Sequence, residues 1–137
     1  MYPDYITVPM RAELAERGFN ELRTAADVDV FMSRQEGTAL LVINSVCGCA
    51  AAGARPGALK ALQHPKRPEV AATVFAGVDI EATQKAREYL LPYPPSSPAI
   101  ALFKDGKLVH LLERRHIEGR SADLIAQNLA MAFDQFC

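Results

Sequence analysis

The segment Thr38–Asn44 constrains the fold more than any other part of the chain. Its sequence, Thr-Ala-Leu-Leu-Val-Ile-Asn, is an almost unbroken apolar run. A strand that is apolar on both faces is typical of a sheet covered by other elements on both sides. A second apolar, β-branched run at residues 70–78 and a third at residues 99–103 are also predicted to be strands. We therefore expect a central sheet between layers of helices.

Segments with helical composition and capping signals lie around these strands. Thr24 is placed to cap the second of them and Ser121 the last. In the third, Pro56 and Gly57 predict a kink or a restart, because proline cannot complete the helical hydrogen-bond pattern. The expected helices cover residues 10–17, 25–34, 50–63, 80–91 and 122–136.

The late part of the chain predicts a β-hairpin. Asp105-Gly106 is a strong signal for a tight turn, and residues 108–113 would return antiparallel to the strand at 99–103. The earlier strand–helix–strand units imply parallel pairing with right-handed crossovers. We therefore expect an α/β fold with three layers, α/β/α, around a mixed sheet. A chain of 137 residues fits one domain, residues 1–137.

The motif Cys47-Gly48-Cys49 falls between the first strand and the helix that follows it. Unpaired backbone N–H groups and the helix dipole favour the thiolate of Cys47, which is the attacking form of cysteine. Cys49 is placed to attack a mixed disulfide on Cys47 and release the bound thiol. A disulfide with one intervening residue should be strained and easily reduced, and Gly48 tolerates the backbone angles of so tight a ring.

A second signal is the Ser97-Pro98 dipeptide, directly before the strand at residues 99–103. A proline before an internal strand, followed by a hairpin and a terminal helix, is the arrangement of thioredoxin-like folds. In those folds this proline is cis and faces the reactive cysteine. We therefore expect a cis bond at Pro98, although only about 5–6% of X–Pro bonds in folded proteins are cis.

Several segments of the chain resemble the bacilliredoxin family, formerly a domain of unknown function. One departure is Ala52-Gly53, where the family often has Gly-Asn before Ala-Arg-Pro. It concerns helix packing beside the motif and does not change a thiol. The resemblance covers nearly the whole chain and is carried by residues 42–51, 54–56, 93–107 and 113–120.

The resemblance implies a thioredoxin-like fold and a thiol-disulfide oxidoreductase. It implies removal of bacillithiol, a low-molecular-weight thiol, from S-bacillithiolated proteins, together with weak disulfide isomerase or reductase activity. Cys47 would be the nucleophile and Cys49 the resolving thiol. The expected partners are S-thiolated or disulfide-bonded client proteins and bacillithiol or a similar small thiol, and we expect no metal or organic cofactor.

Two other functions remain open. Cys47 and Cys49 could belong to a thiolate metal-binding or metallochaperone module, since cysteine pairs also occur as fragments of metal sites. A closed zinc site normally needs four ligands, and no second Cys or His pair has a suitable spacing. A non-catalytic interaction module is the third hypothesis, against which the cysteines at both positions argue.

Four further residues have two interpretations each. Arg55 could steady a thiolate or a substrate carboxylate, but a solvated helix charge is the favoured interpretation. Cys137, the last residue, is interpreted as an exposed thiol without a role, with an intermolecular disulfide or an additional resolving thiol as alternatives. His116 is assigned a surface or capping role, and Asp79 is expected to cap the helix after it rather than act as a base.

The composition gives no sign of an electrostatic partner. The net charge is −1 and the pI about 6.3, so we expect neither nucleic acid nor an anionic membrane as a partner. The first five residues lack the layout of a signal peptide, and no apolar run reaches the length of a membrane span. A cytoplasmic location is expected. Structural disulfides are rare there, and three cysteines form an odd set.

Overall fold

Five strands form one mixed sheet in the computed structural model, which describes residues 2–137. Their spatial order is β1-β3-β2-β4-β5. β1, β3 and β2 are parallel, whereas β4 runs antiparallel to β2, and β5 antiparallel to β4. The mixed sheet is thus confirmed. The strands are β1 (Asn20–Glu21), β2 (Thr38–Asn44), β3 (Val70–Phe75), β4 (Ala99–Lys104) and β5 (Lys107–Leu112).

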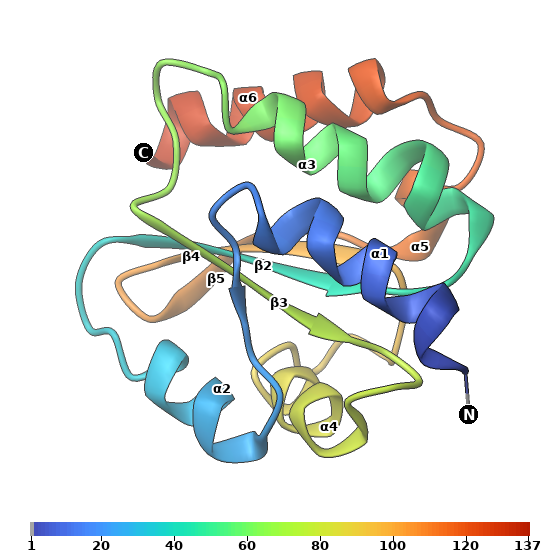
Figure 1. Ribbon diagram of the computed structural model, residues 1–137. Coiled ribbons are helices and arrows are strands. Elements are labelled where there is room, and N and C mark those ends of the chain that lie inside the picture. The colour runs from blue at the N-terminus through green and yellow to red at the C-terminus, as the bar shows by residue number, and fades with distance from the viewer. Residues whose placement is uncertain (1) are drawn as a thin grey trace.

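Helices cover both faces of the sheet (Figure 1). One face carries α1 (Asp4–Ala15), α3 (Arg55–Ala61) and α6 (Ala122–Phe136), and the other carries α2 (Ala25–Met32) and α4 (Ile80–Glu88). This confirms the three-layer α/β/α architecture. A π-helical turn, η1 (Ala50–Ala54), precedes α3, and a four-residue helix, α5 (Arg114–Ile117), links β5 to α6. Within residues 2–137, no helix combines the length and apolarity needed to cross a membrane.

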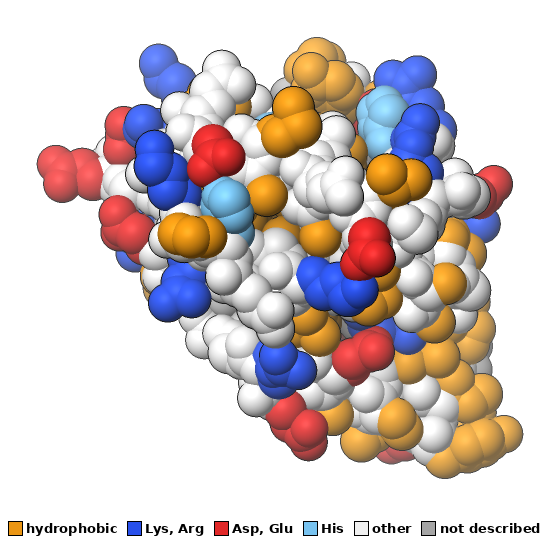
Figure 2. All heavy atoms as spheres, turned by 90° about the horizontal axis from the view of Figure 1, so that it is seen from above, with side chains coloured by type: hydrophobic (Ala, Val, Ile, Leu, Met, Phe, Trp, Pro, Cys, Tyr) orange, Lys and Arg blue, Asp and Glu red, His pale blue; other side chains and the backbone are white. Residues whose placement is uncertain are grey.

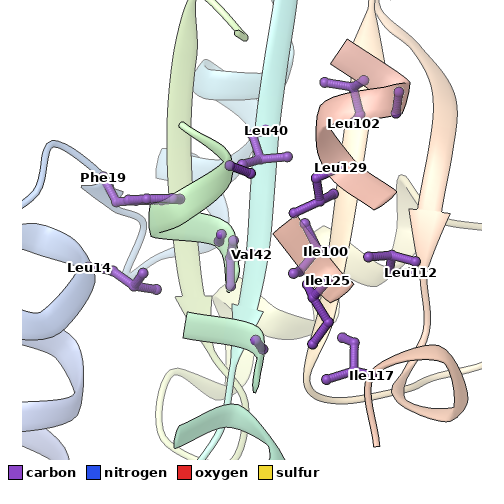
Figure 3. Close-up of a cluster of buried hydrophobic side chains, with 14 of the residues drawn as sticks. Leu14, Phe19, Leu40, Val42, Ile100, Leu102, Leu112, Ile117, Ile125 and Leu129 are labelled. Atoms are coloured by element: carbon purple, nitrogen blue, oxygen red, sulfur yellow. The ribbon is translucent and has the colours of Figure 1, made fainter. Parts of the chain in front are cut away.

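The central strand β2 is buried along all seven residues. Leu40 and Val42 point into the core under α1, α3 and α6, where they meet Ile100 and Leu102 of β4 (Figure 3). The alternate residues Ala39, Leu41 and Ile43 belong to the core under α2 and α4. Successive side chains of a strand point to opposite faces, so an apolar residue at every position requires cover on both. The burial expected from the sequence is confirmed.

The predicted kink before Pro56 is a change of helix type. The backbone N–H of Arg55 donates to the carbonyl of Ala50, five residues back, which is the hydrogen-bond pattern of a π-helix. α3 then begins at Arg55 with Pro56 in its first turn. A proline is tolerated there because the first N–H groups of a helix have no partner within the helix. The π-helical turn starts directly after Cys49 and leads into α3, whose first turn contains Pro56.

Two expected helix boundaries are wrong by three residues or more. α1 begins at Asp4 rather than at residue 10 and contains Pro9 in its interior, where a proline lacks the N–H for a backbone hydrogen bond. α4 ends at Glu88 rather than at residue 91. The hairpin is confirmed, with positive φ at both Asp105 (51°) and Gly106 (80°).

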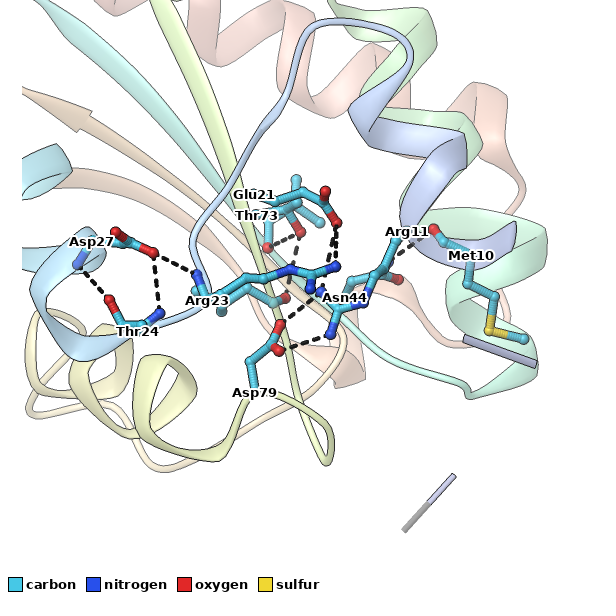
Figure 4. Close-up of polar contacts among 11 residues, drawn as sticks. Met10, Arg11, Glu21, Arg23, Thr24, Asp27, Asn44, Thr73 and Asp79 are labelled. Atoms are coloured by element: carbon cyan, nitrogen blue, oxygen red, sulfur yellow. Dashed lines mark hydrogen bonds and ion pairs between the residues drawn. The ribbon is translucent and has the colours of Figure 1, made fainter. Parts of the chain in front are cut away.

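Asp79 occupies the N-cap position of α4, but its side chain makes no capping hydrogen bond. Instead Arg11 of α1 donates to both carboxylate oxygens of Asp79, at 2.8 and 2.7 Å (Figure 4). The expected side-chain cap is wrong because this buried ion pair takes the carboxylate. Arg11 also lies 3.6 Å from the carboxylate of Glu21 and over the ring of Phe75. The pair fixes α1 against the start of α4.

Two glycines allow α6 to approach the helix that follows the thiol motif. A Cβ on Gly57 would lie 2.6 Å from Cγ2 and 2.9 Å from Cβ of Ile125, whereas one on Gly53 would lie 2.9 Å from Cδ1 of the same residue. The Cβ of Ile125 moves only with the backbone of α6, but its Cδ1 can rotate away.

We expect Gly57→Ala to lower the free energy of unfolding by about 1–3 kcal/mol through overpacking. This loss should outweigh the gain of about 1 kcal/mol in helix propensity. Gly53→Ala is the matched comparison and should cost less, because only the end of the Ile125 side chain must move. Urea denaturation of both variants measures this, and a Gly57→Ala variant as stable as the wild type would contradict the packing.

Candidate functional site

The turn between β2 and η1 holds Cys47 and Cys49 as half-buried free thiols. Their Sγ atoms are in direct contact at 2.6 Å, and the backbone N–H of Cys49 approaches the Sγ of Cys47 at 3.4 Å. The carbonyl of Cys47 accepts from the N–H groups of Ala50 and Ala51, so the turn begins at Cys47 itself. The sulfur of Cys47 therefore lies at the start of a helical turn, as the sequence predicts.

The two thiols differ in acidity. The pKa of Cys47 is lowered, chiefly by the hydrogen bond from the Cys49 thiol, then by the backbone N–H of Cys49 and by the charge of Arg114. The pKa of Cys49 is raised, first by burial and then by its hydrogen bond to Cys47 and the negative charge there. Of the two thiols, Cys47 is therefore the more acidic and the first to form a thiolate as the pH rises.

Arg55 anchors the segment that leads into the motif. Its side chain is only 3% exposed, so the interpretation as a solvated helix charge is wrong. Nη1 donates to Oδ1 of Asn44 and to the carbonyl of Ser45, both at 2.9 Å, and Nε donates to the carboxylate of Glu13. The Oγ of Ser45 in turn accepts from the N–H of Cys47 at 3.0 Å. Arg55 thus positions the backbone before Cys47.

Asn44 completes this anchor at the end of β2. Its Nδ2 donates to the carbonyl of Met10 in α1 at 3.2 Å, and its Oδ1 accepts from the N–H of Ser45 at 2.9 Å (Figure 4). Asn44 is 1% exposed, and a buried amide is stable only when it is hydrogen-bonded. α1, β2 and α3 therefore meet at one point, directly before the thiol pair.

The Ser97–Pro98 bond is cis, as expected from the sequence. Ala99, the first residue of β4, pairs with Ile43 of β2, so this bond lies beside the end of β2 from which the thiol motif begins. The fold thus brings Ser97 and Pro98 to the same edge of the sheet as Cys47. A second cis bond, Leu91–Pro92, was not foreseen.

Arg114 is a charged residue of the site that sequence reasoning missed. Its positive charge acts on both sulfurs and contributes to the lowered pKa of Cys47. β4 is antiparallel to β2, and β5 to β4, so β5 ends at the edge where β2 ends. Arg114 is the second residue after the end of β5. The predicted hairpin already contained this signal, because it implies which charged residues lie after the returning strand.

Cys137 lies at the opposite end of β2. The residue is exposed, as expected, but its thiol contacts the side chain of Thr38, the first residue of the strand, and partial burial there raises the pKa of the thiol. Seven residues of strand separate this end from the thiol motif, roughly 20 Å at about 3.3 Å per residue. Cys137 therefore cannot attack a disulfide on Cys47 within one chain. An intermolecular disulfide at Cys137 stays a prediction.

His116 caps α5, as expected. Its Nδ1 accepts from the backbone N–H of Glu113 at 3.0 Å, and its own backbone N–H donates to the backbone carbonyl of Glu113 at 2.8 Å. In the part of the chain that the structure describes, no three His, Cys, Asp or Glu side chains gather into a group that could hold a metal ion.

The outer surface of α3 and α6 has acidic and basic side chains interspersed (Figure 2). Two contacts join these helices and their ends: Lys60 with Asp123, and His64 with Asp134 at 2.7 Å. Lys60 is half-exposed, in contrast to Arg55 five residues before it. α3 therefore offers a buried and an exposed cation for comparison.

We expect Arg55→Met to lower the free energy of unfolding by about 3–5 kcal/mol, because it leaves buried polar groups at the end of β2 without their donor. Lys60→Met removes the same charge from the same helix, but its exposed ion pair should contribute less than about 1 kcal/mol. Urea denaturation compares the two. Equal losses would show that the Arg55 contacts are not a structural anchor.

Known proteins show the same combination of fold and sequence. The disulphide isomerase family matches residues 2–137. A bacilliredoxin from Cytophaga hutchinsonii is 63% identical over 135 residues, which cover 98% of this chain and 99% of that protein. A bacilliredoxin from Halalkalibacterium halodurans is 53% identical over 139 residues, covering 99% and 96%.

Solved structures similar to this one are thioredoxins. Reduced thioredoxin from Schistosoma mansoni has a TM-score of 0.60 at 14% identity, over 88% of this chain and 99% of its own. Thioredoxin from Fasciola hepatica has a TM-score of 0.57 at 21% identity, over 87% and 100%. The fold is thus thioredoxin-like, as expected. Together with sequence identity along nearly its whole length, this shows that the chain belongs to the bacilliredoxin family and is a thiol-disulfide oxidoreductase.

Proposed function

We propose that this protein removes a low-molecular-weight thiol, bacillithiol or a similar one, from S-thiolated client proteins. The observation that carries the proposal is the contact between two thiols whose pKa values are shifted in opposite directions. It supports a division of roles in which Cys47 attacks and Cys49 resolves. The relatives at high identity are themselves named bacilliredoxins.

The first step is attack by the Cys47 thiolate on the small-thiol sulfur of the mixed disulfide. A new S–S bond joins Cys47 to the small thiol, and the bond to the client sulfur breaks. The electron pair leaves on the client sulfur, which takes a proton from solvent. The lowered pKa of Cys47 favours this step, because thiolate is the attacking form.

In the second step Cys49 loses its proton to solvent and its thiolate attacks the sulfur of Cys47. A Cys47–Cys49 bond forms, the bond from Cys47 to the small thiol breaks, and the small thiol leaves as a thiolate. Burial raises the pKa of Cys49, and so do its hydrogen bond to Cys47 and the negative charge there. The last two causes disappear once Cys47 is in a mixed disulfide, so Cys49 becomes more acidic when it is needed. A thiol pool or a partner reductase then reduces the Cys47–Cys49 disulfide.

Gly48 supports access to the pair. A Cβ at this position would meet nothing within 4 Å, and its φ lies outside the left-handed region in the thiol form. The backbone between the cysteines is therefore uncovered. A client protein can approach the two sulfurs from this side, and weak disulfide isomerase or reductase activity follows from the same chemistry.

Intact-mass analysis of variants tests the proposal. The reduced protein is mixed with a client that carries the small thiol on a single cysteine. We expect the wild type to end as the Cys47–Cys49 disulfide and Cys49→Ala to accumulate the small thiol on Cys47, because it cannot resolve the adduct. Cys47→Ala should lose transfer altogether. Cys137→Ser is the control and should behave as the wild type, since Cys137 lies at the far end of β2.

Two results would contradict the proposal. Transfer by Cys47→Ala at the rate of the wild type would exclude Cys47 as the nucleophile. Tight, stoichiometric zinc or copper in the purified protein, lost in Cys47→Ala, would instead favour the metal-binding alternative.

A further inference from the structure

We infer that Arg114 and the hollow beside it bind a carboxylate on the small thiol, so that the protein prefers mixed disulfides of carboxylate-bearing thiols. This inference rests on the proposed function and names the substrate class of that site. The hollow is open to solvent, with a volume of about 370 Å³. It is shallow, so a ligand there would stay partly in solvent. Its lining comprises Pro95, Ser96, Glu113, Arg114, Arg115 and Glu118.

Arg114 is fixed by contacts on two sides. Its backbone N–H donates to Oγ of Ser96 at 2.7 Å, and its Nη1 makes a long contact of 3.4 Å with the carbonyl of Ser97. Its Nε donates to the carboxylate of Glu118 at 2.8 Å. The segment before Pro98 and the end of α5 therefore hold this side chain in one place, which reduces the entropy that a ligand must overcome.

The Nη2 group of Arg114 makes no hydrogen bond to any residue between 2 and 137. Glu118 engages only the Nε edge of the guanidinium. The side chain is half-exposed, so the remaining N–H donors can reach a ligand. The planar guanidinium matches the geometry of a carboxylate and can bind it through two parallel hydrogen bonds.

The positive charge of Arg114 acts on both sulfurs. The other nearby arginines are engaged elsewhere: Arg55 with Glu13 and the end of β2, Arg87 with the carbonyl of Ser96, and Arg115 with Glu113. Geometry supports the same placement: Arg114 Nη1 lies 3.4 Å from the carbonyl of Ser97, and the strand that begins after Ser97 and Pro98 pairs with the end of β2 that leads into the thiol motif. The pairing of Glu113 and Glu118 with arginines limits their repulsion of an anionic ligand.

This contact would act in both chemical steps. A carboxylate held by Arg114 places the small-thiol sulfur near Cys47 for attack, and the client sulfur then leaves with the electron pair. In the second step the small thiol departs as a thiolate beside the same guanidinium. Exchange conserves the number of disulfides, so the preference needs no further oxidant or reductant.

The test uses two adducts of one client protein that differ only in charge. One carries mercaptopropionate and the other its neutral isostere, mercaptopropionamide. Initial transfer rates are measured by intact mass for the wild type, Arg114→Gln and Arg114→Lys, and the ratio of carboxylate to amide rates is compared. A change in the pKa of Cys47 affects both adducts alike, so this ratio isolates the contact with the carboxylate.

We expect Arg114→Gln to lower the ratio by about three- to tenfold relative to the wild type, the range for losing a charge-assisted hydrogen bond at a half-exposed site. Arg114→Lys should retain part of the preference, because it keeps the charge but not the paired donors. Lys107→Gln removes one positive charge at the far end of the hairpin and should leave the ratio unchanged.

The inference is overturned if Arg114→Gln keeps the carboxylate-to-amide rate ratio of the wild type, or if Lys107→Gln lowers this ratio as much as Arg114→Gln does. In both cases the wild type still transfers the small thiol. Absence of transfer from either adduct to the wild type would instead contradict the proposed function. The two failures are therefore distinguishable in one experiment.

Discussion

The buried guanidinium of Arg55 is the interaction on which the site depends. It joins the carboxylate of Glu13 in α1, the side chain of Asn44 at the end of β2 and the carbonyl of Ser45. Ser45 in turn holds the N–H of Cys47. A charge this deep in the protein is tolerable only when it is paired and hydrogen-bonded. The position of the reactive sulfur therefore depends on a cation that makes no contact with it.

The sheet topology brings the other residues of the site to the thiol pair. β2 and β5 point the same way in the mixed sheet, with the antiparallel β4 between them, so the segments after β2 and β5 meet at one edge. One contributes the thiol pair and the other contributes Arg114. The cis Ser97–Pro98 bond precedes β4 at the same edge. Residues distant in sequence thus act together because three adjacent strands begin or end there.

The fold was more predictable from the sequence than the site. Burial on both faces gave β2 its correct bounds, Asp105-Gly106 predicted the hairpin, and Pro98 was expected to be cis. The burial of Arg55 could not be foreseen, because helical periodicity does not show which residues elsewhere in the chain will accept its hydrogen bonds. These acceptors are in α1, at the end of β2 and in the turn after it. α5 is too short for a periodic signal, so Arg114 was assigned no role. Asp79 was misassigned because its partner Arg11 lies far away in sequence.

The central claim is that the contact between Cys47 and Cys49 separates the two thiols in acidity. Proteins labelled with ¹³C at the cysteine β-carbons allow each thiol to be titrated separately by NMR. The structure predicts that Cys47 titrates below the ordinary pKa of a cysteine and Cys49 above it. As the pH rises, the first thiolate then forms on Cys47. Titration of both cysteines at the ordinary pKa of a cysteine, or a pKa of Cys49 below that of Cys47, would contradict this account.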